Sequence, residues 1–133
     1  GRLDEMQHSQ SVTHKELTAL RQRVNNLKDK EVQVLSNGKL LYESITQNRN
    51  TVHWSNQDFL DFLEYFKFID SPYITQLDEI YNNLSPRQYL FLIAIGRMNK
   101  SETEVGTILA ISPSSVRSIK SRIKNKRIKK EGR

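Results

Sequence analysis

The chain of 133 residues contains no cysteine, one tryptophan, three prolines and five glycines. Without cysteine it can form neither a disulfide framework nor a thiolate metal site, which fits a reducing compartment. Its glycines are scattered, so they form no glycine-rich phosphate-binding loop. No apolar run approaches membrane-spanning length, and no secretory signal precedes the first helical pattern. We therefore expect a cytoplasmic location.

The sequence also lacks the residue groupings of catalytic and metal sites. Its histidines, His8, His14 and His53, are scattered, and no pair of them has metal-ligand spacing with a carboxylate. No serine of the C-terminal basic segment has an adjacent base that would activate it as a nucleophile. We therefore predict that the chain is not an enzyme and holds no metal or cofactor, and we find no evident small-molecule site.

What the chain does have is charge that is segregated along its length. The net charge is +6 overall. Residues 114–133 contain nine Lys and Arg against one acid, Glu131, whereas residues 51–83 contain only Lys67 against six acids. This segregation of charge favours a basic C-terminal end that faces a polyanion, although a disordered basic tail is the common alternative.

Residues 1–35 follow a heptad pattern with a narrow apolar seam. The seam consists of Leu17, Leu20, Val24 and Leu27. It predicts a coiled-coil helix that forms a homodimer, and the flanking charges leave its parallel or antiparallel orientation open. The alternative is an amphipathic helix that packs on its own domain.

Residues 36–83 predict a helical linker region that is acidic and aromatic. The sequence Ser-Asn-Gly at 36–38 predicts a break or kink in the preceding helix. Ser55 and Asp58 resemble a capping box, so a helix is expected to follow them. Its aromatic stripe, Phe59, Phe62 and Phe66, is typical of core residues. A further helix is expected to open at Ser71-Pro72.

Residues 84–133 contain dense helix-start signals. Ser85-Pro86 and Ser112-Pro113 each pair a preferred N-cap residue with proline at the first helical position. Ser101 and Glu104 form a capping box. We therefore expect helices that begin at about residues 86, 102 and 113, and the first of them should be buried and end at Gly96.

The last two of these helices, 102–109 and 113–128, are joined by residues 110–112 and have the parts of a helix-turn-helix. Val116, Ile119 and Ile123 are expected to be buried. The predicted DNA-binding residues are Ser114, Ser115, Arg117, Ser118, Lys120, Ser121, Arg122 and Lys124. A helix face of cations and hydroxyls suits a DNA major groove. Residues 127–133 are expected to form a tail.

Three stretches of the C-terminal region, LSPRQYLFLIAIG, SETEVGTILAIS and SPSSVRSIKSRIKNK, resemble the DNA-binding domain of LuxR-type regulators. The matching residues are Leu84, Ser85, Glu104, Val105, Leu109, Ile111, Ser112, Ser115, Val116, Ile123 and Lys126. The chain departs from the family pattern at Gln88, Gly106, Ile119 and Arg127. The resemblance implies an all-α fold and a domain that binds double-stranded DNA.

A wider resemblance, over residues 40–128, is to Bacteroidetes regulators that carry tetratricopeptide repeats, a coiled coil and a LuxR-like domain. It implies that this chain is the output portion of a larger bacterial regulator, anchored to a membrane only if an upstream segment supplies the anchor. The function expected is therefore sequence-specific transcriptional regulation. Two alternatives stay open: a coiled-coil module whose basic helix binds nucleic acid or an acidic partner non-specifically, and a module like region four of sigma factors.

Overall fold

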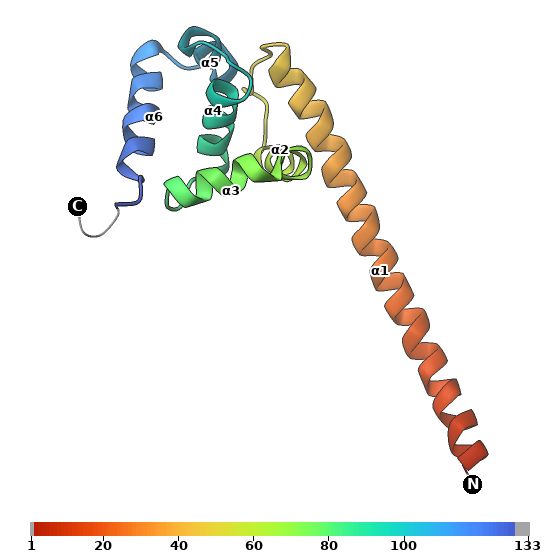
Figure 1. Cartoon of the computed structure of the whole chain (residues 1–133). Helices are drawn as coiled ribbons and strands as arrows, with labels where there is room; N and C mark the ends of the chain where they lie inside the picture. Colours follow the sequence, from red (N-terminus) through yellow and green to blue (C-terminus); the bar gives the residue numbers. More distant parts are fainter. Residues whose placement is uncertain (1, 130–133) are drawn as a thin grey trace. The chain divides into compact units, whose positions relative to one another are not determined.

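The computed structural model describes the backbone of residues 2–129 and the side chains of residues 15–129 other than residue 24. Over these residues the chain folds into helices joined by short connections (Figure 1). The helices are α1 (Arg2–Thr46), α2 (Asn56–Ile69), α3 (Ser71–Ile80), α4 (Pro86–Gly96), α5 (Glu102–Leu109) and α6 (Pro113–Asn125). The predicted all-α fold class is confirmed.

The chain divides into two compact units, residues 1–33 and residues 34–133. The described part of the first unit is the N-terminal portion of helix α1, whose last residues belong to the second unit. Its described heptad residues are exposed: Leu17 by 44%, Leu20 by 50% and Leu27 by 65%. The side chain of Val24, the remaining member of the predicted seam, lies outside the described residues. Within the described residues, the first unit therefore presents apolar side chains that stay largely exposed.

Helix α1 continues without interruption through residues 36–38, so the predicted break at Ser-Asn-Gly is wrong. A Cβ atom on Gly38 would lie 2.3 Å from the Asp61 carbonyl oxygen and 2.5 Å from the Cβ of Tyr65. Asn37 Nδ2 donates to Asp61 Oδ2 at 2.8 Å and to Asp58 Oδ1 at 3.1 Å. These two residues therefore serve a close crossing of α1 and α2, and the contacts offset the helix-breaking tendency of glycine.

The end of α1 and the loop after it are attached to the segment that contains α5. Lys100 Nζ donates to the Thr46 carbonyl at 2.8 Å, and the Thr51 amide donates to the Ile108 carbonyl at 2.7 Å. Asn48, at a positive φ of 60°, donates from Nδ2 to Glu104 Oε2 at 2.8 Å. Residues 34–54 are thus integral to the second unit.

One hydrophobic core holds the second unit together. Its buried apolar residues are Ile45, Phe62, Leu63, Phe66, Ile74, Leu77, Leu90, Phe91, Ile93, Ala94, Val105, Ile108, Leu109, Val116 and Ile123. The expected placement of Phe62 and Phe66 in the core is confirmed, and Phe59 packs at the core's edge with its ring centroid 5.0 Å from that of Trp54. Residues 36–83 and 84–133 were predicted as a linker region and a separate domain, but they share this core.

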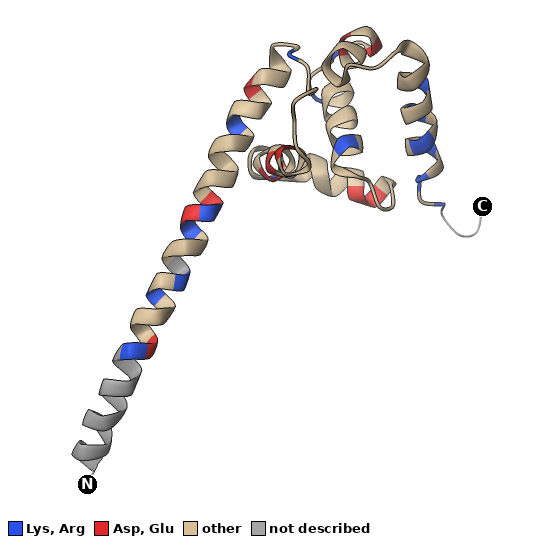
Figure 2. Ribbon diagram, turned by 180° about the vertical axis from the view of Figure 1, so that it is seen from behind, with Lys and Arg blue, Asp and Glu red and all other residues tan. Residues whose placement is uncertain are grey.

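Charge is distributed unevenly over the helices of the second unit (Figure 2). Helix α6 carries Lys and Arg and no acidic residue, whereas α3 carries Asp and Glu and no basic residue. The segregation read from the sequence is therefore also a difference between folded helices.

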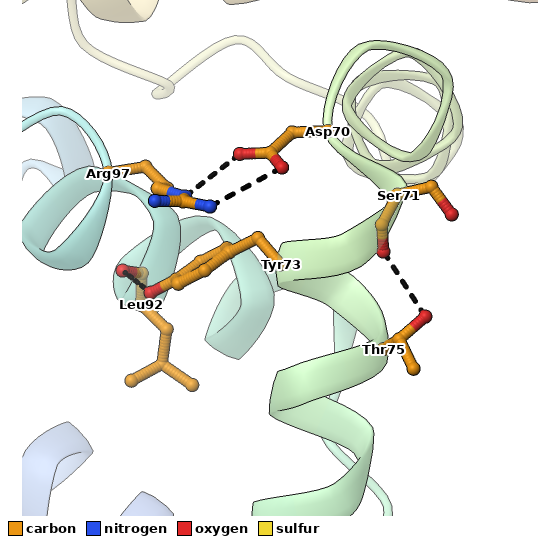
Figure 3. A network of polar contacts seen from close by, with 6 residues as sticks. All are labelled: Asp70, Ser71, Tyr73, Thr75, Leu92 and Arg97. Carbon is orange, nitrogen blue, oxygen red and sulfur yellow. Dashed lines mark hydrogen bonds and ion pairs between the residues drawn. The ribbon is translucent and has the colours of Figure 1, made fainter.

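Helix α3 begins at Ser71, so this serine is not its N-cap residue. Asp70 stands at the N-cap position and makes no side-chain cap hydrogen bond. Its carboxylate instead binds Arg97, with 2.8 Å between Asp70 Oδ2 and Arg97 Nε (Figure 3). The ion pair links the start of α3 to the end of α4.

At the same junction the side chain of Tyr73 extends from α3 towards α4 (Figure 3). Its hydroxyl donates to the Leu92 carbonyl at 3.2 Å, and the Arg97 guanidinium carbon lies 4.6 Å from its ring centroid. A Cβ atom on Gly96 would come within 2.1 Å of the Tyr73 hydroxyl oxygen. Gly96 therefore ends α4 where prediction placed it and also admits this tyrosine.

The serine caps predicted for the last helices are confirmed. Ser85, Ser101 and Ser112 each accept a hydrogen bond from the backbone amide three residues later. Helix α6 ends at Asn125 rather than at residue 128. Arg127 forms an isolated β-bridge with Tyr81, and the Ile128 amide donates to the Ile80 carbonyl at 2.8 Å. The expectation that the tail begins at residue 127 is therefore wrong.

Candidate nucleic-acid interface

Helices α5 and α6 are joined by a tight connection over residues 110–112. Ala110 is left-handed, with φ 54° and ψ 48°, and the Ile111 amide donates to the Gly106 carbonyl at 2.9 Å. A Cβ atom on Gly106 would lie 3.3 Å from the Ile111 carbonyl oxygen and 3.5 Å from Val116 Cγ2. A side chain at 106 would thus require the Ile111 carbonyl to move by a few tenths of an ångström, so the connection passes close to α5 at this point.

Helix α6 has one face in the core. Val116 and Ile123 are only 2% and 3% exposed, and Ile119 is half-buried against the same core. The predicted inward stripe is thus confirmed, with Ile119 at its margin. Because the helix is fixed by this stripe, its opposite face is turned to solvent.

The outward face carries hydroxyls along its centre and cations along its sides. Ser114, Ser118 and Ser121 are exposed and follow one another at helical spacings of four and three residues. Arg117 and Lys124, seven residues apart, flank one side of this stripe. Arg122 flanks the other side. All of these residues belong to the predicted set, and the fold brings them onto one surface.

Two residues of the predicted set are held by other parts of the chain. Ser115 is half-buried, and its hydroxyl accepts a hydrogen bond from the Ser112 hydroxyl at 3.1 Å. Lys120 forms an ion pair with Glu102 of α5. Both residues therefore lie at the edge of the outward face, where local contacts compete with any ligand.

Lys126, which belongs to the LuxR-like pattern, has a role inside the fold. Its Nζ donates to Gln88 Oε1 at 2.6 Å and to the Asn83 carbonyl at 2.8 Å. Gln88 Oε1 also accepts from the Ser85 amide at 3.0 Å, in the capping box of α4. Lys126 thus ties the end of α6 to the start of α4.

Arg87 was not among the residues predicted from the sequence to bind DNA. This residue is exposed in the first turn of α4 and lines a groove that also involves Ser118 and Arg122 of α6. The apolar character of residues 86–96 drew attention to burial and gave no signal for a cation beside α6. Only the packing of α4 against α6 brings Arg87 to this surface.

Glu104, which follows Glu102 by two residues in α5, closes the capping box of that helix. Its pKa is lowered by the hydrogen bond from the Ser101 backbone and by that from the Asn48 side chain. Its carboxylate is therefore engaged in holding the start of α5.

The described part of the chain contains no cluster of three or more His, Cys, Asp or Glu that could hold a metal ion. Within the same residues, no helix combines the length and apolar character that a bilayer crossing requires. Comparison of the chain with protein-family models, with curated proteins and with solved structures finds no match.

Proposed function

We propose that this chain is a sequence-specific transcriptional regulator that binds double-stranded DNA, with α5 and α6 acting as a helix-turn-helix and α6 lying in the major groove. The observation that carries the proposal is the two-sided nature of α6. Its apolar stripe is fixed in the core, and its outward face has hydroxyls and cations without an acid.

The arrangement of that face fits a groove between two phosphate backbones. Small side chains at Ser114, Ser118 and Ser121 allow the helix axis to approach base edges closely, and hydroxyls can donate to or accept from them. Cations on both sides of this stripe, such as Arg117 and Arg122, can reach phosphates or guanine edges. The LuxR-like pattern of residues 84–128 supports the same assignment.

The proposal includes a homodimer formed through the heptad seam of α1. Exposed leucines at positions 17, 20 and 27 are what a coiled-coil helix leaves for its partner. Two α6 helices in one dimer would read paired half-sites, separated by one helical turn of DNA or a multiple of it. In this proposal the chain acts in the cytoplasm as the output portion of a larger regulator.

The test is selection of bound DNA from a random-sequence pool. We expect an enriched motif made of two half-sites. A control selection with Lys39→Ala, which removes a cation from α1, should recover the same motif. Binding without any enriched motif would instead support the non-specific nucleic-acid module, and absence of binding would refute both.

A further inference from the structure

A groove lined by both polar and apolar side chains lies beside the outward face of α6, between this helix and the first turn of α4. Its lining residues are Ser85, Arg87, Gln88, Ile111, Ser115, Ser118, Ile119 and Arg122. Two of them are exposed arginines that come from different helices, Arg87 from α4 and Arg122 from α6. No acidic residue lines the groove.

Both arginines are available to a ligand. In the part of the chain that the structure describes, the ion pairs involve other cations, namely Lys67, Arg97 and Lys120. Gln88, by contrast, is already held by the Ser85 amide and by Lys126, so it forms a fixed wall of the groove. The exposed hydroxyl of Ser118 adds a neutral donor beside the two cations.

This combination is suited to a phosphate group. Guanidinium groups bind phosphate oxygens through paired N–H donors, and two of them can share the oxygens of one phosphate. A carboxylate offers a similar pair of charged oxygens, so the assignment to phosphate depends on the groove's place beside the outward face of α6. An apolar ligand would have to cover two charged groups, at a large desolvation cost.

We propose that this groove holds one phosphate of the DNA backbone, bound jointly by Arg87 and Arg122. The inference rests on the proposed function and adds to it a contact from α4. Phosphate contacts position a protein on DNA without reading sequence. A contact from a second helix fixes the rotation of α6 about its own axis, so Arg87 is a positioning residue for base reading by the serine stripe.

The experiment uses the whole chain and the selected DNA site, in which single phosphates are replaced by uncharged methylphosphonates. For the unmodified chain, we expect one position per half-site at which replacement weakens binding most. In Arg87→Ala and in Arg122→Ala, replacement at that same position should have little further effect, because the contact is already lost. Arg87→Lys should restore part of the sensitivity.

A salt titration supplies a second readout. Loss of one phosphate contact should reduce the slope of log K against log salt by ~0.9 for Arg87→Ala. Lys39→Ala, a cation of α1 that does not line the groove, should leave the slope unchanged. Since Arg87 is exposed, thermal melting of the variant should match that of the unmodified chain and so confirm that it folds.

Three results would overturn the inference in distinguishable ways. If the unmodified chain binds no DNA, the proposed function fails together with the inference. Suppose instead that the chain selects a motif, but the binding free energy lost through Arg87→Ala and that lost through the methylphosphonate add independently. In that case only the inference fails. If inorganic phosphate alone saturates the amide shifts of Ser115 and Ser118 at submillimolar concentration and DNA does not displace it, the groove is a free-anion site instead.

Discussion

Lys120 of α6 forms an ion pair with Glu102 of α5. Both side chains are about half exposed, at 51% and 54%, so the pair contributes no more than ~1 kcal/mol to stability. It nevertheless places a carboxylate beside the proposed DNA-binding face. Lys120 is therefore less free to contact a ligand than its neighbours on α6.

Glu102→Gln should release Lys120 and remove that carboxylate. We expect tighter DNA binding at low salt, a salt slope that is steeper by up to about one unit, and a change in stability below ~1 kcal/mol. Binding isotherms at several salt concentrations measure the first two. Glu79→Gln makes the same change of charge on α3, and an equal gain in both variants would show that net charge alone is responsible.

Arg117→Ala should reduce sequence preference rather than binding in general. If the guanidinium contacts a base, the free-energy difference between the selected site and a site changed at the contacted base should shrink by ~1–3 kcal/mol. Competition binding with the two sites measures it. Lys129→Ala is the comparison, since loss of a phosphate contact weakens both sites alike; the same uniform loss for Arg117→Ala would assign it to the backbone.

Gly38→Ala should destabilise the second unit, although alanine is the better helix former by ~1 kcal/mol. The added Cβ would lie 2.3 Å from the Asp61 carbonyl oxygen, so α1 and α2 must separate. Such overpacking typically lowers the free energy of unfolding by ~1–3 kcal/mol. Chemical denaturation measures this, and Lys39→Ala at the adjacent exposed position should be nearly neutral. An increase in stability for Gly38→Ala would contradict the close crossing.

Acid should destabilise the fold partly through Glu104. Because hydrogen bonds from the Ser101 backbone and from Asn48 lower its pKa below the ordinary value of 4.5, its stabilising contribution is present above that value. The contribution is lost as pH falls through the lowered pKa. Asp58, whose pKa is lowered first by the Ser55 backbone hydrogen bond, acts in the same direction.

Glu104→Gln should therefore reduce stability at neutral pH. It should also make the fall in stability with decreasing pH (the acid limb) shallower, and the remaining fall should be the contribution of Asp58. Thermal melts between neutral pH and about pH 3 follow this dependence. Glu79→Gln, at an exposed position of α3, serves as the control and should keep the full acid limb. An unchanged acid limb in Glu104→Gln would show that the hydrogen bonds accepted by the Glu104 carboxylate do not stabilise the folded state.

Leu20→Glu should convert the proposed dimer to a monomer. Each buried leucine contributes ~1.5–3 kcal/mol, and the dimer loses two of them. The dissociation constant of the dimer should therefore rise by at least about a hundredfold. Sedimentation measures the change, while melting of residues 34–133 should stay the same. Leu40→Glu is the matched control, because Leu40 is 66% exposed on α1 but lies off the seam. Equal dissociation in both variants would contradict dimerisation through the seam.

Much of the second unit could be predicted because its helix starts are determined by local chemistry. Ser85, Ser101 and Ser112 cap helices with their own hydroxyls, and this requires only residues within one turn. The outward face of α6 followed equally well from the spacing of Val116 and Ile123. Arg87 could not be assigned in this way, because its place beside α6 depends on how α4 packs.

The sequence by itself determined where the capped helices α2, α4, α5 and α6 begin and which stripe of α6 is apolar, since caps and spacing act within a few turns. Only the tertiary structure decided what covers each stripe. Ile45 falls in the same heptad register as Leu17, yet Leu17, Leu20 and Leu27 are exposed whereas Ile45 is fully buried in the core. Glycine at 38 likewise reads locally as a helix break. It becomes a point of close helix contact only because α2, distant in sequence, packs against it.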